Sequence, residues 1–244
     1  MKHKIENILT KQEEIKNKLC KERSFSFLRK EDNTMKVLLV NGSPHEKGCT
    51  YTALSEVAKT LNEEGIETEI YWIGTKPIGG CIACKSCSTK GKCVFEDTVN
   101  PFIEKAENAD AFVFGSPVHY AGMAGNMKGF MDRAFYSSSM AKRGKAFLHK
   151  PAASVISARR AGTTATYDEF NKYFGITQMP IISSRYWNMV HGTNPEEVMK
   201  DEEGMQAMRI LARNMAYYLK CIDAGRKAGI EMPKTEKTIF TNFI

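Results

Sequence analysis

The sequence predicts an α/β fold in which helices cover both faces of a parallel sheet, and three observations indicate it. Short apolar segments of strand length alternate with amphipathic segments of helix length from Met35 onwards. The first of them, residues 36–41 (KVLLVN), is a continuous apolar run that ends at Gly42, as is typical of a strand buried on both faces. The 244 residues, 42% of them hydrophobic, are enough for one such domain and an extension.

Five segments have the length and composition of strands. Residues 67–72 (ETEIYW) alternate between polar and apolar side chains, whereas residues 111–115, 152–157 and 179–183 are mostly apolar. With residues 36–41 they predict a doubly wound, five-stranded parallel sheet in the flavodoxin-like order 2-1-3-4-5. In such a sheet the ligand binds beyond the carboxyl ends of strands one and three, where the strand order reverses.

Helices are predicted between and after these strands, at residues 50–64, 99–108, about 125–137, about 164–174 and about 195–224. The first stops at Gly65, a typical C-terminal cap, and the second carries Pro101 in its first turn, where proline is tolerated. The last carries a stripe of methionine and leucine at helical spacing, which we interpret as core or as a subunit interface.

Residues 1–34 form a separate segment. Apolar side chains recur there at helical spacing among lysines and glutamates, and a polar linker follows before Met35. The sequence therefore predicts an N-terminal helical extension at 1–34 and a single domain at 35–244. The extension is expected to pack on its own domain or on a neighbouring subunit.

Charge and hydropathy narrow the possible partners. The net charge is +7, but no long basic run is interleaved with aromatic residues, so nucleic-acid binding is not expected. A surplus of positive charge is compatible with anionic cofactors or substrates, and equally with an ordinary solvated surface. No signal peptide or membrane-spanning run is visible, so a cytoplasmic protein is expected.

A polar segment, residues 79–95, is termed the cysteine loop because it contains four cysteines in the spacing C-x2-C-x2-C-x5-C: Cys81, Cys84, Cys87 and Cys93. Its other residues are mostly glycine, serine, threonine and lysine, so packing does not explain the thiols. The short C-x2-C steps favour an iron–sulfur cluster. Structural zinc, a disulfide formed after purification and a loop that holds no metal remain as alternatives.

The loop after the first strand, residues 41–52 (NGSPHEKGCTYT), has the chemistry of a phosphate site. It joins a buried strand to a helix whose first N–H groups lack partners, and Ser43 and Thr50 add hydroxyls. It contains neither a Walker-type lysine nor a G-x-G-x-x-G fingerprint, which favours a mononucleotide phosphate over NAD. The alternative is an ordinary turn in which Thr50 caps the helix.

Two further loops follow strands three and four. Residues 115–125 (GSPVHYAGMAG) offer Tyr120 and several glycines, which suit the wall of a flat aromatic ring, although loop packing explains them equally well. Residues 157–164 (SARRAGTT) offer backbone donors, hydroxyls and two adjacent arginines, which are usually solvated but could bind a flavin carbonyl or a phosphate.

These motifs together resemble the NADPH-dependent FMN reductase family of flavodoxin-like proteins, and within it the iron–sulfur flavoproteins. The resemblance covers Met35 to Ile244 and is carried by VNGSPHEKGCT, CIACKSCSTKGKCVFEDTV and FGSPVHYAGMAGNMKGFMDRAF. The first motif departs from the family pattern, since His45 and Cys49 stand where relatives often carry arginine and asparagine.

The resemblance implies a set of cofactor contacts. The FMN phosphate would lie at Ser43, Pro44, Gly48, Cys49, Thr50 and Tyr51. The flavin ring would lie against Pro117, Val118, His119, Tyr120, Ala158, Arg159, Arg160, Ala161 and Gly162. A four-iron four-sulfur cluster (4Fe-4S) would bind Cys81, Cys84, Cys87 and Cys93, in dimers or tetramers that bring the cluster of one subunit near the FMN of another.

The function expected from the sequence is therefore that of an FMN-dependent oxidoreductase with the cysteine cluster as entry or exit for electrons. NAD(P)H, ferredoxin or a quinone would be its electron partner, and His119 is a candidate proton donor. One alternative is a cluster-free NAD(P)H-dependent FMN or quinone reductase. A second is a flavodoxin-type electron carrier, which the sequence pI of about 8.9 disfavours because such carriers present acidic surfaces.

Overall fold

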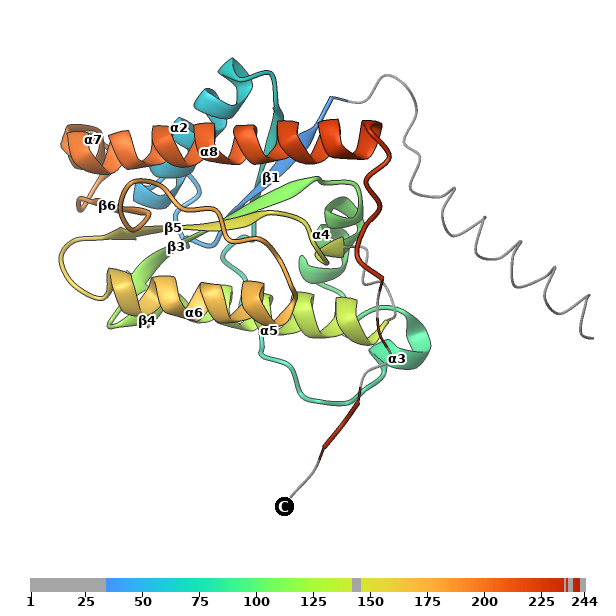
Figure 1. Ribbon diagram of the computed structural model, residues 1–244. Coiled ribbons are helices and arrows are strands. Elements are labelled where there is room, and N and C mark those ends of the chain that lie inside the picture. Colours follow the sequence, from blue (N-terminus) through green and yellow to red (C-terminus); the bar gives the residue numbers. More distant parts are fainter. Residues whose placement is uncertain (1–33, 142–145, 235, 237–238, 242–244) are drawn as a thin grey trace, which may run out of the picture. The chain divides into compact units, whose positions relative to one another are not determined.

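The computed structural model in Figure 1 describes residues 34–141, 146–234, 236 and 239–241. The chain divides into two units, Met1–Thr34 and Met35–Ile244. The helix predicted for the extension lies outside the described residues. In the described part of the chain, no helix combines the length and the apolar character that a membrane span needs.

The sheet has six strands, five of them parallel in the order β2-β1-β3-β5-β6. Their bounds are β1 Lys36–Asn41, β2 Glu67–Trp72, β3 Ala111–His119, β5 Ala152–Ala158 and β6 Met189–His191. The two-residue strand β4 (Gly122–Met123) pairs antiparallel with the end of β3 and lies off this path. Counted over the parallel strands alone, the order is the predicted flavodoxin-like 2-1-3-4-5.

Helices cover both faces of the sheet (Figure 1). One face packs on α2 (Cys49–Glu63), α7 (Pro195–Lys200) and α8 (Glu202–Lys227). The other packs on α4 (Val99–Glu107), α5 (Gly125–Met140) and α6 (Thr163–Ile176), while the one-turn helix α3 (Cys87–Lys90) contacts α5. Alternation along β1 explains the two layers, because Val37 and Leu39 enter one core and Leu38 and Val40 the other.

The predicted fifth strand, residues 179–183, is in the wrong place. Only Ile181 forms an isolated bridge there, to Ala152, and Pro180 has no N–H to donate to a ladder. The fifth parallel strand is β6, which pairs with the carboxyl end of β5. Its three residues are too few to produce a periodic pattern in the sequence.

The predicted long C-terminal helix is two helices separated at Asp201. This residue ends α7 with a non-helical ψ of 77°, and its carboxylate accepts a hydrogen bond from the N–H of Gly204 at 2.9 Å, which caps α8. The stripe on α8, from Met205 to Leu219, is buried against α2 and the sheet. Its interpretation as core is confirmed.

Candidate functional site

The carboxyl ends of β1, β3 and β5, termed the sheet edge, bring the predicted loops together. The N–H of Gly42 donates to the carbonyl of Gly115 at 2.8 Å, which joins the loops after β1 and β3. A Cβ atom on Gly115 would lie 2.8 Å from the side chains of both Thr50 and Leu54, so α2 can approach β3 this closely only because the residue is glycine.

Asn41, the last residue of β1, shapes the loop after it, and the sequence analysis missed this role. Its buried side-chain oxygen accepts from the N–H of Ser43 at 3.0 Å, and its amide nitrogen donates to the carbonyl of Glu46 at 2.9 Å. The indole N–H of Trp72 donates to the carbonyl of Ser43 at 2.8 Å. An asparagine followed by glycine at the end of a strand was the available signal.

The start of α2 has no side-chain cap among the residues that the structure describes. Gly48 is the residue before the helix and has no side chain to cap it, and the first turn contains no acidic residue. Thr50 is therefore not the N-cap, contrary to the alternative considered above. Its hydroxyl is buried and bonded to that of Ser157 at 2.8 Å, so it braces the loop after β5. An uncapped N-terminus attracts anions because of its free N–H groups and the helix dipole.

The other predicted phosphate contacts surround this helix start. Pro44 is exposed and Tyr51 half-buried. The thiol of Cys49 lies 3.7 Å from the carbonyl of Gly192, and burial, followed by the nearby carboxylates of Glu197 and Glu196, raises its pKa. Cys49 is therefore neutral at pH 7 and adds no negative charge to the site.

The segments predicted to contact the flavin ring lie against each other. Residues 117–123 form a tight β3–β4 hairpin, which the sequence analysis missed, with Tyr120 at its turn in a left-handed conformation (φ 57°) and fully exposed. A Cβ atom on Gly162 (φ +95°) would lie 2.7 Å from a side-chain carbon of Val118 and 3.3 Å from the carbonyl oxygen of Tyr120. The loop after β5 thus packs directly on the hairpin.

Other predicted ring contacts vary in exposure. Pro117 and Val118 are half-buried and Ala158 is buried. The side chains of His119, Arg159, Arg160 and Ala161 are exposed. The buried and half-buried residues of this set are thus apolar, whereas its charged and histidine side chains are exposed.

The cysteine loop leads from β2 across the face of α5. The segment between β2 and this loop is held by Asn126, which accepts from the N–H of Ile78 at 3.1 Å and donates to the carbonyl of Lys76 at 3.0 Å. The backbone turns sharply between the cysteines, because Ala83 (φ 52°) and Lys85 (φ 56°) are both left-handed. Such conformations are uncommon for residues other than glycine and concentrate at functional sites.

All four cysteines line one cavity, termed the cysteine cavity, together with residues of α5. Cys87 is buried, Cys93 half-buried, and Cys81 and Cys84 are exposed. The backbone N–H and the hydroxyl of Ser86 lower the pKa of the Cys84 thiol, whereas burial raises the pKa of Cys87. The cavity lies about 10 Å along α5 from Asn126, because Arg133 follows seven residues later at 1.5 Å per residue.

The donor chemistry of this cavity fits an iron–sulfur cluster. In the described residues, no group of three or more histidine, cysteine, aspartate or glutamate side chains is close enough to hold a single metal ion. In a four-iron cluster each thiolate binds a different iron, so its four sulfurs stand further apart than the ligands of one ion. The four thiols around one cavity supply the donor type and number that such a cluster takes.

Two side chains missed by the sequence analysis hold the fourth cysteine. The side chain of Asn100 on α4 accepts from the N–H of Cys93 at 3.0 Å and donates to the carbonyls of Cys93 at 3.0 Å and Phe95 at 3.1 Å.

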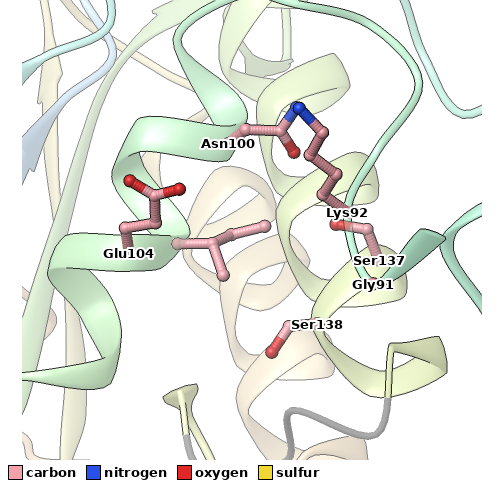
Figure 2. Close-up of a pocket in the computed structure, with 7 residues that line it drawn as sticks. Gly91, Lys92, Asn100, Glu104, Ser137 and Ser138 are labelled. Atoms are coloured by element: carbon pink, nitrogen blue, oxygen red, sulfur yellow. The ribbon is translucent and has the colours of Figure 1, made fainter.

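Figure 2 shows the small adjoining pocket, where Asn100 and Glu104 project from α4 and Ser137 and Ser138 from α5. From α5, the guanidinium of Arg133 contacts Cys93 and Asp97.

Comparison with known proteins identifies a relative and structural neighbours. An iron–sulfur flavoprotein of Methanocaldococcus jannaschii is 30% identical over 195 residues, which cover 77% of this chain and 99% of that protein. RosB, solved with a bound 8-demethyl-8-formylriboflavin-5'-phosphate intermediate, superposes with a TM-score of 0.60 at 14% identity over 86% of this chain and 92% of RosB. A WrbA-like flavodoxin from Agrobacterium tumefaciens superposes with a TM-score of 0.52 at 15% identity over 78% and 99%.

The fold and the sheet edge define a flavodoxin-like protein. Residues 35–194 match the NADPH-dependent FMN reductase family, and the chain belongs to it, in the subgroup whose curated relatives are named iron–sulfur flavoproteins. Membership of this family identifies the chain as a flavin-dependent oxidoreductase.

Proposed function

We propose that this chain binds FMN at the sheet edge and a four-iron four-sulfur cluster in the cysteine cavity, and that it passes electrons between a soluble donor and an acceptor. The observation that carries the proposal is that Cys81, Cys84, Cys87 and Cys93 line a single cavity although the loop between them contains almost no apolar residues. The relative from Methanocaldococcus jannaschii, itself named an iron–sulfur flavoprotein, supports it.

At the sheet edge, the uncapped start of α2 would hold the FMN phosphate. The backbone N–H groups of Cys49, Thr50 and Tyr51 are the donors, with Ser43 and Pro44 closing the loop around the anion. Ser157 holds Thr50 in place, and the absence of an acidic residue in this first turn keeps repulsion low.

The β3–β4 hairpin and the loop from Ala158 to Gly162 would hold the flavin ring. Tyr120 is exposed at the turn of the hairpin and can stack on the ring, and Arg159 and Arg160 can pair with its carbonyls or with a pyridine-nucleotide phosphate. His119 stands exposed at the end of β3, where it can hold a proton for the ring. These contacts would bind and orient the flavin, whereas the cofactors would supply the redox chemistry.

When bound, FMN would supply chemistry that couples a two-electron donor to a one-electron acceptor such as the cluster. The chain's own part would be to hold the FMN at the sheet edge and the cluster in the cysteine cavity beside α5. Dimers or tetramers that bring the cluster of one subunit to the flavin of another are part of the proposal.

Anaerobic purification followed by a visible spectrum and by assays of iron, sulfide and FMN per chain tests the proposal. We expect flavin bands with a broad shoulder and about four irons per chain. Flavin bands without iron would contradict the cluster and leave a cluster-free reductase. Anaerobic titration with NADH, NADPH and reduced ferredoxin then identifies the electron donor. A flavin that none of them reduces would contradict the proposed oxidoreductase activity.

A further inference from the structure

One face of α5 presents polar side chains to the cysteine cavity. Arg133 and Ser137 lie four residues apart, so they share a side of the helix, and both line the cavity. Neither residue belongs to the cysteine loop or to the predicted flavin contacts.

Arg133 is buried and aims one N–H group at a cysteine sulfur. It is 1% exposed, its Nε lies 3.3 Å from Cys93 Sγ, and its two Nη atoms bond to the carboxylate of Asp97 at 2.5 and 2.9 Å. The guanidinium also lies over the ring of Phe95, 4.7 Å from its centroid. Asp97 therefore neutralises the charge, and Nη2 also donates to the carbonyl of Phe95 at 3.5 Å. Nε is the donor that points at the sulfur.

Ser137 has a buried hydroxyl that is unsatisfied. The residue is 3% exposed, and Oγ has no hydrogen-bond partner among the described residues. Burying a hydroxyl without a hydrogen-bond partner costs free energy. A bound group in the space next to it is therefore expected to supply the partner. Ser137 lines the cysteine cavity as well as the small adjoining pocket of Figure 2.

We propose that Arg133 and Ser137 are positioning residues that donate hydrogen bonds to sulfur atoms of the iron–sulfur cluster and thereby raise its reduction potential. This inference rests on the proposed function. Reduction adds one electron, and so one unit of negative charge, to a group surrounded by thiolates. Donors aimed at the sulfurs stabilise that added charge more than they stabilise the oxidised state, and hydrogen bonds to sulfur are an established determinant of cluster potential.

The test is an anaerobic redox titration of the holoprotein with dithionite as the electron donor, followed by the cluster's electron paramagnetic resonance signal. Arg133→Lys keeps the positive charge but removes the Nε donor. We expect its midpoint potential to fall by about 59 mV or more, which corresponds to a tenfold change in the one-electron equilibrium constant. Ser137→Ala, a small substitution that the fold should tolerate, is expected to lower the potential by a smaller amount.

Ser138→Ala is the matched control. Ser138 is buried next to Ser137 on α5 and lines the same adjoining pocket, but it does not line the cysteine cavity, so its variant should keep the wild-type potential. A purely structural role for Arg133 and Ser137 predicts less iron per chain with an unchanged potential in the cluster that remains, and that result would overturn the inference alone. Wild-type protein without iron would overturn the proposed function as well.

Discussion

The sheet edge and the cysteine loop prepare their binding groups in opposite ways. The sheet edge depends on backbone, with an uncapped helix start at Gly48 and close approaches at Gly115 and Gly162. The cysteine loop depends on side chains: four thiols, the amide of Asn100 and the guanidinium of Arg133. A site made of backbone is sensitive to an added Cβ, whereas a site made of side chains is sensitive to their truncation.

The strongest test of this contrast removes two thiols. Replacing both Cys84 and Cys87 by serine should lower the iron content from about four per chain to near zero, because two irons lose their ligands. The FMN content should not change, since the sheet edge keeps all its groups. Cys221→Ser, at an exposed position on α8, is the control and should keep its iron. Loss of FMN together with iron would show that the two sites are not independent.

The next test loosens the cysteine loop without touching a thiol. Asn100→Ala removes three hydrogen bonds and leaves the N–H and carbonyl of Cys93 without this partner, so the free energy of unfolding should fall by about 1–3 kcal/mol. Denaturant unfolding measures it, and FMN affinity should stay within about twofold of wild type. Asn108→Ala, exposed at the end of the same helix, is the control, with a change of at most about 0.5 kcal/mol.

A third test adds a single carbon to the sheet edge. Gly162→Ala places a Cβ where the backbone is left-handed and where Val118 is 2.7 Å away, so the loop must shift from the hairpin. We expect FMN to bind roughly tenfold more weakly, about 1.4 kcal/mol, in a fluorescence titration of the apoprotein. Gly175→Ala in α6, where a Cβ meets no atom within 4 Å, should leave the affinity unchanged. Equal effects of the two variants would contradict the contrast.

The smallest expected effect concerns the charge at the start of α2. Gly48→Asp and Gly48→Asn both add a side chain that can cap the helix, but only aspartate is negative. FMN should bind about fivefold more weakly to the aspartate variant than to the asparagine variant, about 1 kcal/mol, because the carboxylate repels the phosphate. Equal affinities would place the phosphate elsewhere. The capped start of α8, with Asp201, Glu202 and Glu203, shows how a helix start without an anionic ligand is built in this chain.

Local patterns predicted most of the fold. The bounds of β1 and β2 agree with the structure because a strand's alternation and the glycine that ends it lie within a few residues. β6 was misplaced because its three residues are strand only through their pairing with Ile156, Ser157 and Ala158 of β5. The β3–β4 hairpin was missed for the same reason, since two residues carry no periodicity.

The sequence by itself determined the doubly wound sheet, the phosphate-type loop after β1 and the four-cysteine set, because each is written in residue types and spacing within one segment. Only the tertiary structure decided that Thr50 braces Ser157 and that Arg133 reaches Cys93. The physical reason is burial. A polar group removed from water needs a hydrogen-bond partner. Arg133 and Cys93 are 40 residues apart in the chain, so no local sequence pattern predicts their contact.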